Sequence, residues 1–188
     1  NNSRDDAERL ASAIIVAGGQ AHVVLADLAD REAVRGLVPA AAAFGRLTLL
    51  VNNAGEFEPD DIETLSHARF QRAIAVNLEA PLFLSQAFAA QAPEGLDASI
   101  VNIVHQRVLK PNPRFFSYTL SKSALFTATT TLAQALAPRI RVNGVAPGPT
   151  LPSPRQTDAQ FAAQADSVPL KRGPQPDGDV GDPHHLGD

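Results

Sequence analysis

The hydrophobic and polar positions of this chain form short, largely apolar runs that are separated by longer segments with helical spacing. Apolar runs occupy residues 22–26, 47–51 and 100–104, and a fourth begins at Arg141 and closes with a Pro-Gly turn. Runs of this length are typical of strands that are buried on both faces of a parallel sheet. The pattern therefore predicts four strands.

The segments between these runs carry apolar residues three and four positions apart, which predicts helices. The first helix ends at Gly18-Gly19 and the second at Gly45, because glycine favours the conformation that ends a helix. A third helix is predicted over residues 66–91 and a fourth from near Tyr118 to Ala137. The buried faces of the first two are formed by Ala7, Leu10, Ala11, Ile14 and Ile15, and by Val34, Leu37, Val38 and Ala41. Strands that alternate with helices predict an α/β fold with a parallel sheet.

Composition narrows the possible classes of protein. The chain has 188 residues, of which 44% are hydrophobic, so it is most simply one domain. A net charge of −4 gives no basic surface for nucleic acid. We see no apolar run long enough to cross a bilayer and no signal peptide, which predicts a cytoplasmic protein without a membrane partner.

Three residue types carry further information. The absence of cysteine excludes disulfides and cysteine nucleophiles, and the absence of methionine indicates that a segment is missing at the front of the chain. His184-His185 lie in a tail rich in glycine and proline, where adjacent histidines lack a fixed geometry for a metal ion. We therefore predict no metal site.

Polar residues and glycines follow three of the predicted strands. Asn53-Ala54-Gly55 follow the second run, His105 follows the third, and Pro147-Gly148 close the fourth. In open α/β sheets, ligands bind at the carboxyl ends of the strands. A side chain at Gly55 would obstruct a close approach to the backbone there. Simple chain reversal is the competing interpretation of both glycine turns.

Tyr118 and Lys122 are four residues apart on the last predicted helix, so their side chains point the same way. A tyrosine titrates near ~10, and it exchanges a proton at neutral pH only if a nearby group stabilises its phenolate. An ammonium one turn away can do so. The alternative is a surface tyrosine beside a solvated lysine.

Four segments occur together in the order typical of one family: 51–55, 100–104, 118–122 and 141–148. The chain resembles the short-chain dehydrogenase/reductase family, and its pteridine reductase-like branch, from about Ser3 to Arg172. The resemblance implies a Rossmann-like doubly wound sheet over residues 1–172. A complete member opens with a strand, a glycine-rich turn, a helix and a second strand. We expect this first βαβ segment and the last strand to be lacking, and residues 173–188 to form a disordered tail.

The resemblance implies a catalytic role for Tyr118, Lys122, Asn77 and His105. Tyr118 would be the general acid, and Lys122 would lower its pKa and bind the nicotinamide ribose. Asn77 lies on the apolar stripe of the third helix, where a buried polar residue needs partners. Its backbone carbonyl would hold a water that links Lys122 to solvent. Pro81 cannot donate to that carbonyl and is expected to bend the helix, which reinforces the relay or only shapes the packing.

His105 departs from the family pattern. The family has a serine at this position and the pteridine reductase branch an aspartate, either of which orients the substrate. A histidine with a pKa near ~6.5 would make this role depend on pH. The competing interpretation is a substitution tolerated in a partly open site.

The cofactor residues are also implied by the resemblance. Asp27 and Leu28 would lie beside the adenine ring, Asn53, Ala54 and Gly55 along the adenosine ribose, and Pro147 and Gly148 at the nicotinamide amide. Asp27 has a competing interpretation as a loop cap near Asp30. Ser3 and Arg4 favour the phosphate of NADP, although Arg4 can instead pair with acidic neighbours, and NAD remains the alternative cofactor.

The predicted function is NAD(P)H-dependent reduction of a carbonyl or imine, in a ketone or a pterin-like compound. Gln106-Arg107 and the prolines of residues 147–156 favour the pterin-like substrate. Phe115 and Phe116 are equally suited to stack on a flat ring or to belong to the core. We expect a homo-oligomer, a dimer or tetramer, formed through the two long helices. The alternative function is a non-catalytic family remnant that binds a protein partner.

Overall fold

The structure is a computed structural model that describes residues 2–150 and 157–167. The chain divides into two compact units, residues 1–145 and 146–188, and each is described by itself. In the second unit, helix α6 (Asp158–Ser167) follows the Pro147-Gly148 turn. The predicted tail at 173–188, the His184-His185 pair and most of the proline-rich segment lie outside the described residues.

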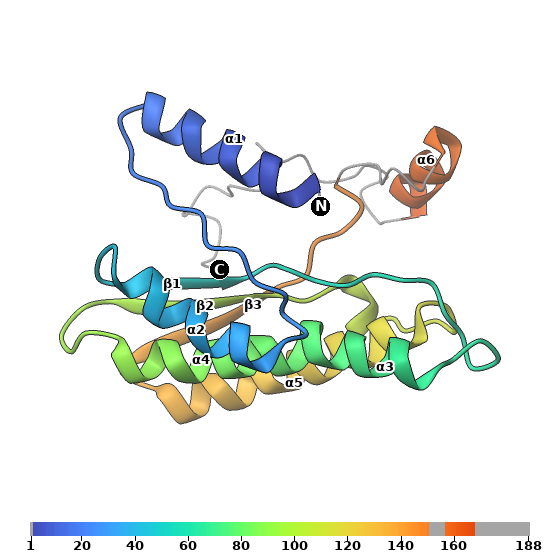
Figure 1. Cartoon of the computed structure of the whole chain (residues 1–188). Coiled ribbons are helices and arrows are strands. Elements are labelled where there is room, and N and C mark those ends of the chain that lie inside the picture. Colours follow the sequence, from blue (N-terminus) through green and yellow to red (C-terminus); the bar gives the residue numbers. More distant parts are fainter. Residues whose placement is uncertain (1, 151–156, 168–188) are drawn as a thin grey trace, which may run out of the picture. The chain divides into compact units, whose positions relative to one another are not determined.

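The first unit is built on a parallel sheet of three strands. Strands β1 (Leu49–Asn52), β2 (Ala98–Ile103) and β3 (Ile140–Val145) lie in the order β1-β2-β3 (Figure 1). Asn52 pairs with Asn102, which pairs with Gly144, so the three carboxyl ends are level at one edge. The α/β fold and three of the four predicted strands are confirmed.

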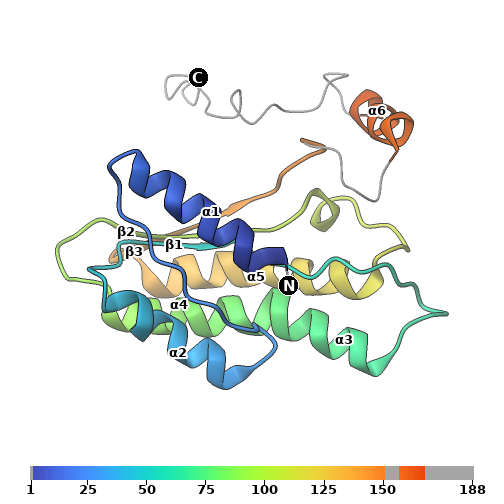
Figure 2. The ribbon, with the colours of Figure 1, turned by 45° about the horizontal axis from the view of Figure 1, so that its top comes forward.

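Helices α2 (Arg31–Ala42), α4 (Ala80–Gln91) and α5 (Phe116–Leu136) cover one face of this sheet (Figures 1 and 2). The core between them contains Phe88 from α4, Ile100 from β2 and Ile140 from β3. A second cluster joins Val34 and Val38 of α2 to α4. Leu132, Ala133 and Leu136 of α5, the helix that carries Tyr118, pack against the first cluster.

The predicted strand at residues 22–26 does not form. Val23, Val24 and Leu25 are more than one third exposed, and the segment has irregular backbone. A strand needs a neighbour to satisfy its backbone N–H and C=O groups, and among the described residues β1 pairs only with β2. The apolar face predicted for helix α1 (Asn2–Val16) is not buried either, and Leu10 and Ile15 remain exposed.

The third predicted helix is interrupted near Pro81. It begins as α3 (His67–Ile74), capped by the Ser66 side chain, and passes through a π-helical turn, η1 (Ala75–Glu79), into α4. Pro81 has no N–H to donate to the carbonyl four residues earlier, which explains why the regular pattern fails at this turn. The expected bend therefore takes the form of a π turn that contains Asn77.

The run His67–Gln91 is long and apolar enough to cross a membrane, by length and composition. The sequence prediction that no such run exists was therefore wrong. Within it, Phe88 is buried against Ile100 of the sheet, and Asn77 and Ser85 are buried with hydrogen-bond partners. We interpret the run as a core helix of this fold.

Candidate active site

Tyr118 and Lys122 lie together on α5, as their spacing predicts. Both side chains are buried, and the Lys122 Nζ lies 5.9 Å from the centre of the Tyr118 ring. The Nζ donates a hydrogen bond of 2.7 Å to the carbonyl of Ile103, the last residue of β2. Burial lowers the pKa of Lys122 to about 8. The pair is therefore part of the interior rather than a solvated helix face.

The surroundings of Tyr118 shift its pKa upward. Burial raises it to about 12, and the cation that opposes this increase is Arg107 rather than Lys122. The Lys122 ammonium is directed to the Ile103 carbonyl, so its charge is not placed on the phenol oxygen. The phenol therefore keeps its proton at neutral pH, and the effect of Lys122 on the pKa of Tyr118 stays a prediction.

Asn77 connects the turn after β1 to α5. Its side-chain carbonyl accepts from the Glu56 N–H at 2.8 Å, and its amide donates to the Glu56 carbonyl and to the Ser121 Oγ, both at 3.0 Å. Ser121 in turn donates to the carbonyl of Tyr118. The prediction that a buried Asn77 needs partners is confirmed. These partners fix the position of the Gly55-Glu56 turn relative to α5.

Gly55 lies against the same group of residues. A Cβ added there would be 3.3 Å from the Asn77 Oδ1 and 3.7 Å from the Lys122 Nζ. The neighbouring Asn53 and Ala54 are exposed at the carboxyl end of β1. The turn therefore presents an open backbone with the Lys122 ammonium next to it, which fits a ligand that carries hydroxyl groups.

His105 is a neutral side chain in this structure. Its ring lies edge-to-face with Tyr118 at 5.5 Å, and its Nδ1 accepts from the Arg107 N–H at 3.1 Å. Burial, followed by the charges of Arg107 and Lys122, lowers its pKa to about 4. The expected titration near neutral pH is therefore wrong. Because Nδ1 is an acceptor, the ring proton lies on Nε2.

Phe57 is a residue of this site that the sequence interpretation missed. Its ring stacks on Phe115 with centres 4.1 Å apart, and it meets the Tyr118 ring edge-to-face at 4.6 Å. The Arg107 guanidinium lies 4.6 Å from the Phe115 ring centre. The available signal was an aromatic residue two positions after Gly55. Together these side chains form an aromatic wall beside Tyr118.

Asp60 was missed as well. It is buried, its carboxylate accepts from the Ser117 N–H at 3.1 Å and from the Ser117 hydroxyl, and its carbonyl accepts from the Phe116 N–H at 3.2 Å. The residue before the helix, Phe115, has a left-handed backbone with φ of 56° and gives no side-chain cap. Asp60 therefore caps α5 from a distant loop, directly before Tyr118.

We expect Asp60→Ala to lower the free energy of unfolding by about 1–3 kcal/mol, because two buried donors of Ser117 lose their acceptor. Urea denaturation measures this change. Asp60→Asn keeps one acceptor oxygen and is expected to lose less. A loss below about 0.5 kcal/mol for Asp60→Ala would show that the cap contributes little.

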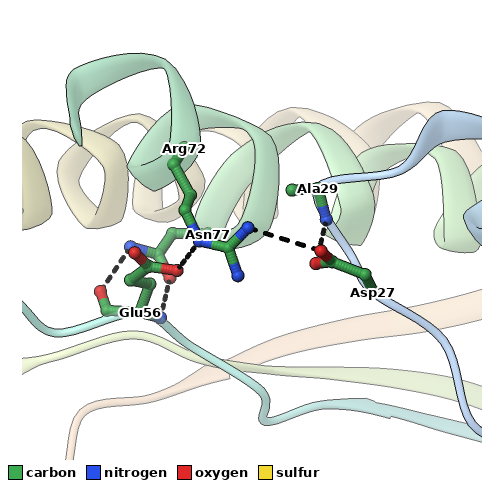
Figure 3. Close-up of polar contacts among 5 residues, drawn as sticks. All are labelled: Asp27, Ala29, Glu56, Arg72 and Asn77. Carbon is green, nitrogen blue, oxygen red and sulfur yellow. Dashed lines mark hydrogen bonds and ion pairs between the residues drawn. The ribbon is translucent and has the colours of Figure 1, made fainter. Parts of the chain in front are cut away.

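Asp27 and Leu28 lie in the loop before α2. The Asp27 carboxylate accepts from the Ala29 N–H at 3.0 Å and pairs with Arg72 at 3.4 Å, as Figure 3 shows. The helix cap is Asp30, whose side chain accepts from the Glu32 and Ala33 N–H groups. Asp27 is therefore not the cap of α2, and Leu28 is half-buried next to it.

The remaining predicted cofactor residues lie toward the two ends of the chain, in helix α1 and in the second unit. Ser3 and Arg4 lie in the first turn of α1, where Arg4 forms an exposed ion pair with Glu8 at 3.6 Å. Pro147 and Gly148 belong to the second unit, so their role stays a prediction. Among the described residues no cluster of three or more His, Cys, Asp or Glu side chains could hold a metal ion.

Comparison with known proteins gives the family. The short chain dehydrogenase profile matches residues 1–162. In structure, the chain superposes with a TM-score of 0.87 on the FolM alternative dihydrofolate reductase 1 from Brucella suis, solved in complex with NADP. The two are 52% identical, and the match covers 92% of this chain and 70% of that one.

Two curated relatives of known sequence are also oxidoreductases by name. An uncharacterised oxidoreductase of Methylorubrum extorquens is 38% identical over 94% of this chain and 73% of its own length. The chloroplastic NADPH-dependent aldehyde reductase 1 of Arabidopsis thaliana is 36% identical over 71% of this chain, which spans about half of that relative, 48%. The chain belongs to the short-chain dehydrogenase/reductase family of oxidoreductases.

Proposed function

We propose that this protein uses NADPH to reduce a C=N or C=O bond in a pterin-like ring. The observation that carries the proposal is the buried Tyr118 and Lys122 pair, which lies beside the open Gly55 turn and the aromatic wall of Phe57 and Phe115. The 52% identity to a FolM reductase supports the pterin-like substrate, and its complex with NADP supports the cofactor. NAD remains the alternative cofactor.

Tyr118 is the proton donor in this proposal. Reduction adds a hydride to the carbon of the double bond and a proton to its nitrogen or oxygen, and the bound nicotinamide supplies the hydride. A phenol with a pKa of about 12 is protonated at neutral pH, so the proton is available. Lys122 and the Asn53-Ala54-Gly55 backbone would hold the cofactor ribose groups, and Asp27 and Leu28 the adenine end.

His105 would donate a hydrogen bond to the substrate. Its Nε2 carries the ring proton, so a neutral histidine offers the same kind of donor as the serine hydroxyl of other family members. The pKa of about 4 keeps this donor unchanged across the neutral range. The substitution of serine by histidine is therefore compatible with catalysis.

The pKa of His105 also predicts how stability depends on pH. The unfolded imidazole takes up its proton near 6.5 and the folded one only near 4, so the unfolded state binds more protons between these values. The free energy of unfolding is expected to fall as pH drops from 6.5 towards 4. Urea denaturation of the protein and of His105→Gln isolates this contribution, because the variant lacks it.

An exposed histidine on α3, His67, provides the control substitution His67→Gln. If His105→Gln shows the same loss of stability as the unmodified protein over this pH range, His105 is not held neutral by its surroundings.

A substrate panel tests the proposed function. NADPH consumption is followed with a dihydropterin, dihydrofolate, an aliphatic ketone and an aromatic aldehyde, each with the unmodified chain. We expect turnover with the two pterin compounds, because a flat ring can stack against Phe57. Turnover confined to ketones or aldehydes would contradict the substrate class while leaving the reductase chemistry intact.

A further inference from the structure

Arg72, on α3, joins two turns of the candidate site. Its Nε lies 2.6 Å from the Glu56 Oε2, and its Nη1 lies 3.4 Å from the Asp27 Oδ2. Figure 3 shows the guanidinium between the two carboxylates. One side chain of α3 thus bridges the loop after residues 22–26 and the turn after β1.

Each end of this bridge is also held on its other side. The Asp27 Oδ1 accepts from the Ala29 N–H, which orients the carboxylate toward Arg72. The Glu56 backbone is fixed by two hydrogen bonds with the Asn77 side chain, which is fully buried. Arg72 therefore connects a loop that has no strand pairing with the sheet to a turn that is fixed in the core.

The chemistry of the bridge requires an arginine. A guanidinium carries donors on separate nitrogens in a planar fork, so it can meet two carboxylates in fixed directions, whereas the lysine ammonium is a single point of charge. The Arg72 side chain is half-exposed, and an exposed pair contributes only ~0–1 kcal/mol to stability. The bridge is therefore expected to contribute little to folding stability.

The neighbours of Asp27 also keep its carboxyl group ionised. The Ala29 N–H and then Arg72 lower the pKa of the Asp27 carboxyl, so it remains an ionised acceptor at neutral pH. Asp97 and Arg141 form a comparable exposed pair at the far ends of the strands. That pair provides a matched control, because it lies outside the candidate site.

We propose that Arg72 is a positioning residue for the cofactor: it fixes the Asp27-Leu28 loop relative to the Gly55-Glu56 turn, so that both receive the adenosine half together. This inference rests on the proposed function, in which these two turns bind the cofactor. The same bridge would leave the nicotinamide half and the proton donor unaffected.

The test compares Arg72→Met, Arg72→Lys and the control Arg141→Met in the full chain. Calorimetry measures the Kd for NADPH and for reduced nicotinamide mononucleotide, which lacks the adenosine half. We expect Arg72→Met to weaken NADPH binding about fivefold, the size of one exposed charge pair, and to leave the mononucleotide affinity and kcat unchanged. Arg72→Lys is expected to restore only part of the affinity. An equal loss for both ligands, or no loss of NADPH affinity, overturns the proposal.

Amide hydrogen exchange separates this inference from the proposed function. Arg72→Met is expected to speed exchange at Ala29 by about threefold or more, because the loop loses its anchor, while Arg141→Met leaves it unchanged. If the unmodified chain binds no NADPH, the proposed function fails, and unchanged exchange at Ala29 then also overturns the bridge. If Arg72→Met does not fold, Glu56→Gln replaces it. This variant weakens only the Arg72–Glu56 contact, and the same cofactor affinities and the same exchange at Ala29 are measured.

Discussion

Tyr118→Phe is expected to lower turnover about a thousandfold, because it removes the only proton donor that the proposed mechanism places at the reacting atom. Phenylalanine keeps the ring contacts with Phe57 and His105, so the wall beside the substrate is preserved. The measurement is steady-state NADPH consumption with a dihydropterin as substrate.

The control for Tyr118→Phe is NADPH binding, which is expected to stay within about twofold, since the phenol oxygen contributes only part of the cofactor contacts. A second control is Phe116→Leu, which changes a neighbouring aromatic residue of α5 without removing a proton. If Tyr118→Phe keeps a turnover within tenfold of the unmodified protein, another group supplies the proton.

Lys122→Met is expected to lower turnover at least about a hundredfold and to weaken NADPH binding, while the protein stays as stable or becomes more stable. The ammonium is buried, and burial lowers its pKa to about 8, which means that the folded state disfavours its charge. Methionine is similar in length and can occupy the same space without that cost. Activity and stability are therefore expected to change in opposite directions.

The lowered pKa of Lys122 also predicts how the free energy of unfolding depends on pH. The unfolded lysine releases its proton near 10.5 and the folded one near 8, so the unfolded state binds more protons between these values. Stability is expected to rise across this range in the unmodified protein relative to Lys122→Met. Lys110→Met removes an exposed charge and serves as the control. A loss of stability in Lys122→Met near neutral pH would contradict this interpretation of the buried ammonium.

The features that the sequence predicted correctly are local. Tyr118 and Lys122 are one helical turn apart, and the buried Asn77 follows from the apolar stripe around it, so neighbours in sequence contain the information. The continuous apolar runs at 47–51 and 100–104 likewise predicted where β1 and β2 end to within one residue.

The features that the sequence did not predict depend on distant partners. Asp60 caps a helix 57 residues away, and Arg72 meets an aspartate 45 residues away, so neither pairing has a signature in nearby residues. The segment at 22–26 has the composition of a strand, but a strand forms only with a neighbour. The pKa of His105 depends on burial, which the sequence does not contain.

The most direct test of the account is a calorimetric titration of the full chain with NADPH and, separately, with NADH. The account predicts saturable binding of one NADPH per chain, weaker binding of NADH, and a further loss of NADPH affinity in Lys122→Met. No heat of binding with either cofactor would contradict the proposed NADPH-dependent reductase and would favour a family member that acts without the cofactor.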